Sequence, residues 1–153
     1  MSPVWTIVQK EWMEIRKNKL ILSVVVFVPL IMVVIPIVML VFSFFGGAFG
    51  MAEEGMPFAL IFVPLAIALG YDSIVAVTVT FVASQVGNAV SWMSPFSVAI
   101  AQGIAGIPVL SGARFRLVLW FVGTALAAAY MMVYAEKIRK DPKKSVVYET
   151  DAY

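Results

Sequence analysis

Two adjacent carboxylates, Glu53 and Glu54, lie in a long stretch of sequence that is otherwise apolar and rich in glycine. A charged side chain at the centre of a lipid-facing helix costs about 2.5–3.5 kcal/mol, so acidic residues at such depth normally face protein or water and serve a function. No basic residue between Lys19 and Arg114 is present to neutralise them. At depth, two such carboxylates raise each other's pKa and share one proton or cation. The pair therefore predicts a site for a coupling ion (Na⁺ or H⁺) or for the cationic group of a basic amino acid. The alternative is a solvated loop.

A second group of polar residues recurs at intervals of four, four and three, which places them on one helix face. Its members are Thr80, Ser84, Asn88 and Ser91. This face leads to Ser94-Pro95, where the proline removes a backbone hydrogen bond and interrupts the helix. A new helix opening at Phe96 would direct its positive end toward a carboxylate, and Gln102 follows further along it. We predict a substrate path formed by this face, Ser94, Pro95 and Gln102. The alternative is hydrogen bonding that holds helices together.

Composition excludes other kinds of chemistry. Without cysteine or histidine the sequence has no thiol nucleophile and none of the usual zinc, haem or triad sites, and no phosphate-binding loop is present. The hydrophobic content is 62% and the mean hydropathy +0.97, against roughly 45–50% apolar residues in soluble domains. A net charge of +2 is too small to indicate nucleic acid. We therefore expect no enzymatic activity and no cofactor, and the lipid bilayer as the partner.

Four apolar segments must position these side chains: residues 20–45, 56–69, 74–107 and 115–135. The first contains Pro29 and Pro36, each of which invites a bend. The second is only about 21 Å long as a helix, against a hydrocarbon core of about 30 Å, and with the glycine-rich turn at 46–55 it predicts a re-entrant hairpin. Ser94-Pro95 divides the third segment, and the fourth is a plain transmembrane helix. The predicted fold is an all-α integral membrane protein.

The charged ends set the expected orientation and domain limits. Residues 1–19 combine one apolar stripe with a polar face, which predicts an interfacial helix on the membrane surface. Residues 20–136 form the predicted membrane domain, and residues 137–153 form a basic tail. Because positively charged segments stay on the cytoplasmic side, both termini are predicted to be cytoplasmic in a multi-pass protein of the cell inner membrane.

Two smaller features have structural interpretations. Asp72 is predicted to cap the helix that follows it at the cytoplasmic surface. The pairs Gly46/Gly50 and Ala99/Gly103 have the small-residue spacing that lets helices approach closely.

Five strings carry a resemblance to a known family: FGGAFGMAEE at 45–54, ALGYDS at 68–73, SWMSPF at 91–96, IAQGIAG at 100–106 and SGARFR at 111–116. From about residue 35 to residue 151 the sequence resembles part of the first half of YfcC-type carriers. These are described as basic-amino-acid antiporters and are grouped with the anaerobic C4-dicarboxylate carriers. The resemblance implies two inverted repeats, each with a re-entrant hairpin and a discontinuous helix, and a substrate bound where their tips meet. Two departures affect the substrate contacts, since the family usually has Asn where Ser94 stands and an apolar residue where Asn88 stands.

The sequence thus predicts part of an ion-coupled secondary carrier for amino acids or small organic acids, as an incomplete or fused fragment. Two interior carboxylates and no interior basic residue favour a basic amino acid over a dicarboxylate. A second repeat, or a homo-oligomer, would have to complete the site. Residues 1–40 resemble instead the start of an ABC-type permease, so a permease subunit is one alternative. A small non-transporting membrane interaction protein is the other.

Overall fold

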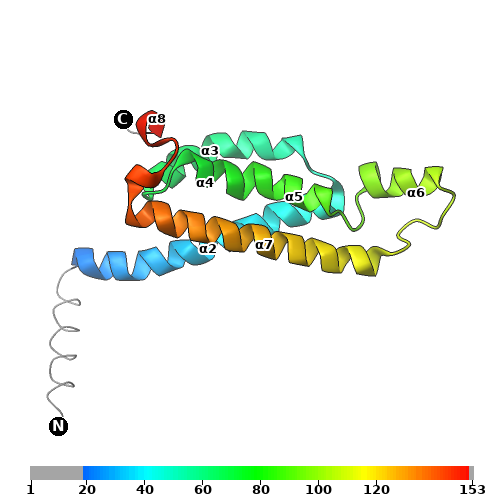
Figure 1. Cartoon of the computed structure of the whole chain (residues 1–153), viewed down its shortest axis with the longest axis horizontal. Coiled ribbons are helices and arrows are strands. Elements are labelled where there is room, and N and C mark those ends of the chain that lie inside the picture. Colours follow the sequence, from blue (N-terminus) through cyan, green and yellow to red (C-terminus); the bar gives the residue numbers. More distant parts are fainter. Residues whose placement is uncertain (1–18, 152–153) are drawn as a thin grey trace, which may run out of the picture. The chain divides into compact units, whose positions relative to one another are not determined.

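The computed structural model describes the backbone of residues 19–151 and the side chains of residues 32–151 (Figure 1). Within these residues all regular structure is helical, with no strand, which confirms the all-α prediction. Met1–Val34 and Ile35–Tyr153 form two compact units, and the description below concerns the second unit unless stated. The interfacial helix predicted over residues 1–19 lies, apart from Lys19 at the start of α2, outside the described residues.

Two helices have the length and hydropathy to cross a membrane. The first is α2 (Lys19–Phe49), an α-helix that continues without interruption through both prolines and whose residues 32–49 meet the criterion. The second is α7 (Ala113–Lys140). Large apolar side chains of α7 are exposed, among them Leu126 at 67% and Val133 at 72%, as expected for contact with lipid. Together with the composition, these helices confirm an integral membrane protein.

The second apolar segment is α3 (Met56–Ala68), which follows a short 3₁₀ turn, η1 (Glu53–Gly55). Its 13 residues rise only about 20 Å, less than the roughly 30 Å of a hydrocarbon core. A tight turn ends it at Gly70, whose φ of +83° lies in the left-handed region that favours glycine. The predicted short second arm of the hairpin is therefore present.

The third apolar segment is broken where the sequence predicted. Its first part comprises α4 (Ser73–Val77), a π-helical turn η2 (Thr78–Val82) and α5 (Ala83–Ala89). Residues 90–94 are not helical. A second π-helical turn, η3 (Pro95–Ala99), then leads into α6 (Ile100–Ile104). Two short elements, η4 (Pro142–Lys144) and α8 (Tyr148–Asp151), follow α7.

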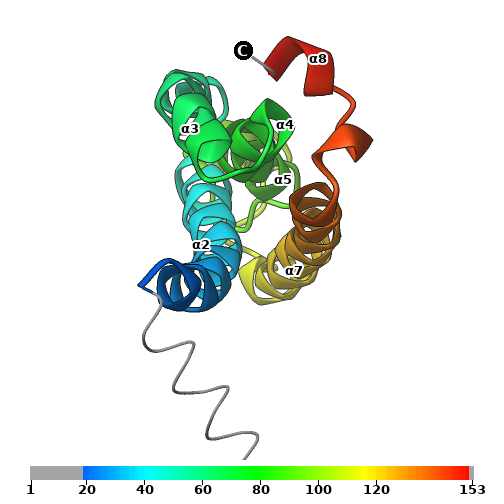
Figure 2. The same ribbon diagram turned by 90° about the vertical axis from the view of Figure 1, so that its left-hand side faces the viewer.

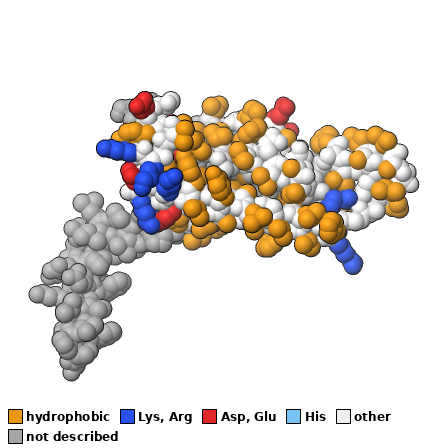
Figure 3. All heavy atoms as spheres, viewed as in Figure 1, with side chains coloured by type: hydrophobic (Ala, Val, Ile, Leu, Met, Phe, Trp, Pro, Cys, Tyr) orange, Lys and Arg blue, Asp and Glu red, His pale blue; other side chains and the backbone are white. Residues whose placement is uncertain are grey.

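α3, the α4–α5 segment and α7 run side by side, each antiparallel to the one before it, and α6 lies beyond the end of α5 (Figures 1 and 2). α4 packs on α3, and α5 packs on α7. Small and medium apolar side chains such as Val79, Ala83, Met131 and Ala135 are buried between them. On the face shown in Figure 3, hydrophobic side chains cover the middle of the unit and charged side chains gather at the end that carries α8. α7 continues through the predicted domain limit at 136/137, and that limit stays a prediction.

Candidate functional site

The end of α2 packs against α5 with backbone in contact with backbone. A Cβ atom on Gly87 would clash with the Ser43 carbonyl group, and its distance to the carbonyl carbon would be only 2.7 Å. A Cβ atom on Gly46 would clash in the same way with the Ser84 carbonyl oxygen. The close approach predicted for Gly46 is therefore confirmed. In the part of the chain that the structure describes, nothing lies within 4 Å of the Cβ position of Gly103, so the close approach predicted there is not found among these residues.

Glycine also forms the turn of the hairpin that follows. Gly50 has a φ of +75°, and its N–H donates to the Gly46 carbonyl at 3.0 Å, which ends α2. A Cβ atom at this position would clash with the Ser94 hydroxyl as well. The tip of the hairpin, residues 50–55, thus lies directly against the interrupted helix.

Serine side chains join the tip and the break. The Ser91 hydroxyl donates to the Gly47 carbonyl at 2.8 Å and accepts from the Ser94 N–H at 3.0 Å. Ser94 is fully buried, and its hydroxyl accepts from the Ser97 N–H at 3.4 Å as the cap of the second helix. On the other side of the tip, Ser84 and Gln85 donate to the Ala52 carbonyl at 3.4 and 3.3 Å. Backbone groups left unpaired by the break and the turn are therefore satisfied locally.

Glu53 and Glu54 lie on the same tip, but their side chains are directed away from the interrupted helix. Both side chains are exposed, and Glu54 Oε2 accepts from the Ala52 N–H at 2.9 Å. Among the described residues, no group of three or more acidic side chains is placed to hold a metal ion.

An open groove of about 320 Å³ lies beside the break. It brings together three of the predicted site residues, Asn88, Ser91 and Gln102, and adds Arg116 from α7. Its lining residues are Asn88, Ala89, Ser91, Ser97, Val98, Ala101, Gln102 and Arg116. None of them is acidic, so neither glutamate contributes to the groove. Ser94 and Pro95 shape the break without lining the groove.

Gln102 uses its whole side-chain amide within the protein. Its Nε2 donates to the Ser111 carbonyl, and its Oε1 accepts from the Leu110 N–H, both at 2.8 Å. The side chain is 4% exposed. Gln102 therefore fastens the loop before α7 to α6 and forms one wall of the groove.

Arg116 is the groove residue that the sequence did not reveal. Its Nη2 donates to the Ser111 carbonyl at 2.9 Å, whereas its Nε is shielded from solvent and has no hydrogen-bond partner. In the described part of the chain it forms no ion pair within 4 Å. Arg114 and Arg116 both begin α7, but Arg114 is exposed and does not line the groove. The sequence does not show which of the two arginines reaches the groove, because this depends on how α5 packs on α7.

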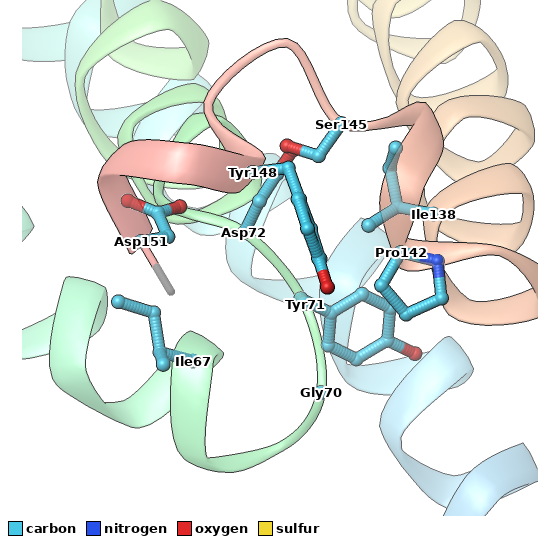
Figure 4. A pocket seen from close by; sticks show the side chains of 9 residues that line it. All are labelled: Ile67, Gly70, Tyr71, Asp72, Ile138, Pro142, Ser145, Tyr148 and Asp151. Carbon is cyan, nitrogen blue, oxygen red and sulfur yellow. The ribbon is translucent and has the colours of Figure 1, made fainter. Parts of the chain in front are cut away.

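A second cavity, of about 170 Å³, lies where the α3–α4 turn meets the segment after α7 (Figure 4). Asp72, 3% exposed, caps α4 as predicted by accepting from the Val75 N–H at 3.0 Å. Its other oxygen accepts from the hydroxyls of Tyr134 and Ser145, both at 2.7 Å. The carboxylate of Asp151 in α8 accepts from the N–H of Ser73, the residue that follows Asp72, at 2.7 Å. Asp72 therefore ties the hairpin to α7 and to the chain's last described segment.

Comparisons with known proteins point to one family. The family model for the C4-dicarboxylate anaerobic carrier matches residues 10–153. A protein of Escherichia coli (strain K12), YfcC, described as a proposed basic amino acid antiporter, is 50% identical over 114 residues, which are 74% of this chain and 22% of that protein. An uncharacterized protein of Haemophilus influenzae is 41% identical over 104 residues, 68% of this chain and 20% of its own length. The chain thus spans about a fifth of these curated relatives. No solved structure matches.

Proposed function

Because this chain belongs to the C4-dicarboxylate anaerobic carrier family, we propose that it is part of an ion-coupled secondary carrier for amino acids or small organic acids. The groove beside the break at residues 90–94 is its substrate path. The remainder of the site comes from a second repeat or another copy, and the protein lies in the cell inner membrane with both termini cytoplasmic. The chemistry is binding and movement of a solute, with no enzymatic step.

One observation carries this proposal: a glycine-lined hairpin tip and an interrupted helix meet in one place. In membrane transporters, non-helical backbone at depth occurs where it is buried in protein or lines a water-filled cavity. Discontinuous helices of this kind form substrate and ion sites near the midplane of the membrane. Here the break is buried on one side by Gly47 and opens on the other side into a polar groove.

The length of α3 supports placing the tip inside the membrane. Its 13 residues fall about 10 Å short of a crossing, and Asp72 and the basic end of α7 lie at the opposite, cytoplasmic end of the hairpin. Glu53 and Glu54 would then face a coupling ion, or the part of the carrier that completes the site.

The proposal is tested by protection from chemical labelling. The chain contains no cysteine, so Ser97→Cys introduces a single thiol in the groove, and Val146→Cys places a control thiol on the exposed segment after α7. The purified chain in lipid nanodiscs is labelled with a water-soluble maleimide in the presence of arginine, ornithine or succinate. Saturable slowing of labelling at position 97 and not at position 146 by at least one solute is expected. No slowing by any of the three would refute the proposed substrate path.

Transport is measured separately by counterflow of the same labelled solutes into liposomes, with Glu53→Gln and Ser94→Asn beside the wild type. We expect Glu53→Gln to reduce counterflow. Ser94→Asn restores the family's usual residue, and we expect it to retain or increase counterflow. Equal background-level uptake by all three proteins would show that the chain does not transport by itself.

A further inference from the structure

We infer that the groove binds its solute by a carboxylate group, with Arg116 as the residue that recognises it. This inference rests on the proposed function and names the class of group that the substrate path accepts.

The first argument is the state of the Arg116 guanidinium. A guanidinium has five N–H donors in a planar fork, and burial of an unpaired donor is costly. Nη2 is engaged by Ser111 and Nε is shielded from solvent, but Nη1 forms no hydrogen bond with any described residue, and Arg116 lines the groove. A carboxylate bound in the groove would accept from the Nη1 side of the guanidinium in a charge-assisted hydrogen bond.

The second argument is the charge of the groove. No acidic side chain lines it, and Glu53 and Glu54 lie on the exposed surface of the tip. A cationic group would therefore meet a positive charge without a neutralising carboxylate, whereas an anionic group would be attracted. A basic amino acid was expected because no basic residue lies between Lys19 and Arg114. Arg116 of α7 lines the groove, however, and gives it a positive charge.

The third argument is a neutral donor beside the arginine. Asn88 lines the groove and is only half buried. Its amide can donate to the second oxygen of a carboxylate or to another polar group of the solute. The Gln102 amide already bonds the loop through both its oxygen and its nitrogen, and only its second Nε2 hydrogen is left.

The two solute classes named above share the required group. An amino acid carries one carboxylate and a dicarboxylate carries two, so a carboxylate contact is common to both. Selection between them then depends on residues outside this groove, including the exposed glutamates of the tip.

The experiment uses Ser97→Cys in nanodiscs and compares protection by arginine, arginine methyl ester and succinate. These probes are titrated in backgrounds that also carry Arg116→Gln, Arg116→Lys or Arg114→Gln. We expect arginine to protect at a concentration at least tenfold lower than its methyl ester, which lacks the carboxylate. Arg116→Gln should abolish this preference, Arg116→Lys should keep part of it, and Arg114→Gln should leave it unchanged.

The possible results separate the two proposals. Equal protection by arginine and its ester in the wild type, or equal effects of the Arg114 and Arg116 variants, would overturn the carboxylate contact and leave the substrate path intact. If Arg116 only holds the loop, Arg116→Gln would weaken arginine and its ester by the same factor, which also overturns the inference. If succinate alone protects and the protection requires Arg116, the carboxylate contact stands and the solute is a dicarboxylate. If no probe protects, both proposals fall.

Discussion

Replacing Gly87 by alanine tests the backbone contact on which the site is built. In an isolated helix this change would stabilise, because alanine is favoured over glycine by about 0.8–1 kcal/mol. Here the new methyl group would lie 2.7 Å from the Ser43 carbonyl carbon, and ordinary contacts begin at about 3.4 Å. The two helices must therefore separate by at least about 0.7 Å, the difference between these distances.

That separation has a cost that can be bounded. A gap of about 0.5–1 Å forfeits roughly a quarter to a half of the dispersion energy at each contact. Overpacking of this kind costs about 1–3 kcal/mol. The Ser43 carbonyl also accepts from Trp120 Nε1 at 3.1 Å, and this bond would be strained. Because the Ser43 carbonyl oxygen lies even closer than its carbon, the cost falls in the upper part of this range, about 2–3 kcal/mol. After subtracting the gain in helix propensity of about 0.8–1 kcal/mol, we expect Gly87→Ala to lower the free energy of unfolding by about 1–2 kcal/mol.

Gly103→Ala provides the matched control. Gly103 is also helical, has an ordinary negative φ, and nothing lies within 4 Å of its Cβ position, so the same substitution should be neutral or stabilise by up to about 1 kcal/mol. Unfolding in mixed detergent micelles, followed by tryptophan fluorescence, gives both values. If the two variants shift the unfolding midpoint equally, the packing deduced for α2 and α5 is wrong.

Three further predictions concern single side chains. Asp72→Ala removes a helix cap worth about 1 kcal/mol and the acceptor of two hydroxyl groups. We therefore expect the free energy of unfolding to fall by at least about 2 kcal/mol in the same assay, and to fall less in Asp72→Asn. Ser91→Ala removes the shorter of two hydrogen bonds to the Gly47 carbonyl, which also accepts from the Met93 N–H at 3.4 Å. The change should cost about 1 kcal/mol and raise amide hydrogen exchange at residues 90–94, and unchanged exchange would contradict the role given to this hydroxyl. Burial raises the pKa of the Tyr71 phenol, so the contribution of this group to stability is complete below about pH 10 and is lost as the pH rises through the higher folded pKa. Absorbance titration of Tyr71→Phe should show one late-ionising tyrosine fewer than that of the wild type, and an unchanged titration would contradict this prediction.

Local signals explain what the sequence could predict. The break follows from Ser94-Pro95, because a proline has no N–H to donate to the preceding turn and the serine before it caps the next helix. The short second arm follows from the glycines that bound it, and the role of Asp72 as a cap follows from its place directly before an apolar helix.

Properties that depend on distant packing were not predictable in this way. Nothing in the sequence around Arg116 indicates a binding role, and only the contact of α5 with α7 shows that it reaches the groove. Gln102 appeared to be a substrate ligand, yet the loop before α7 occupies its amide. Glu53 and Glu54 appeared to belong to the substrate path, yet both side chains are exposed and neither lines the groove.

The π-helical turn at Thr78–Val82 has a consequence for comparing this chain with its relatives. Such a turn accommodates one extra residue, and each residue of an α-helix turns by about 100°. Deleting the extra residue there would return the segment to a regular α-helix and leave the residues on either side, including Asn88 and Ser91, on the faces that they occupy now. A one-residue gap in this short stretch of an alignment would therefore keep the same side chains facing the groove, whereas a gap within α5 would turn one part of the helix against the other by about 100°.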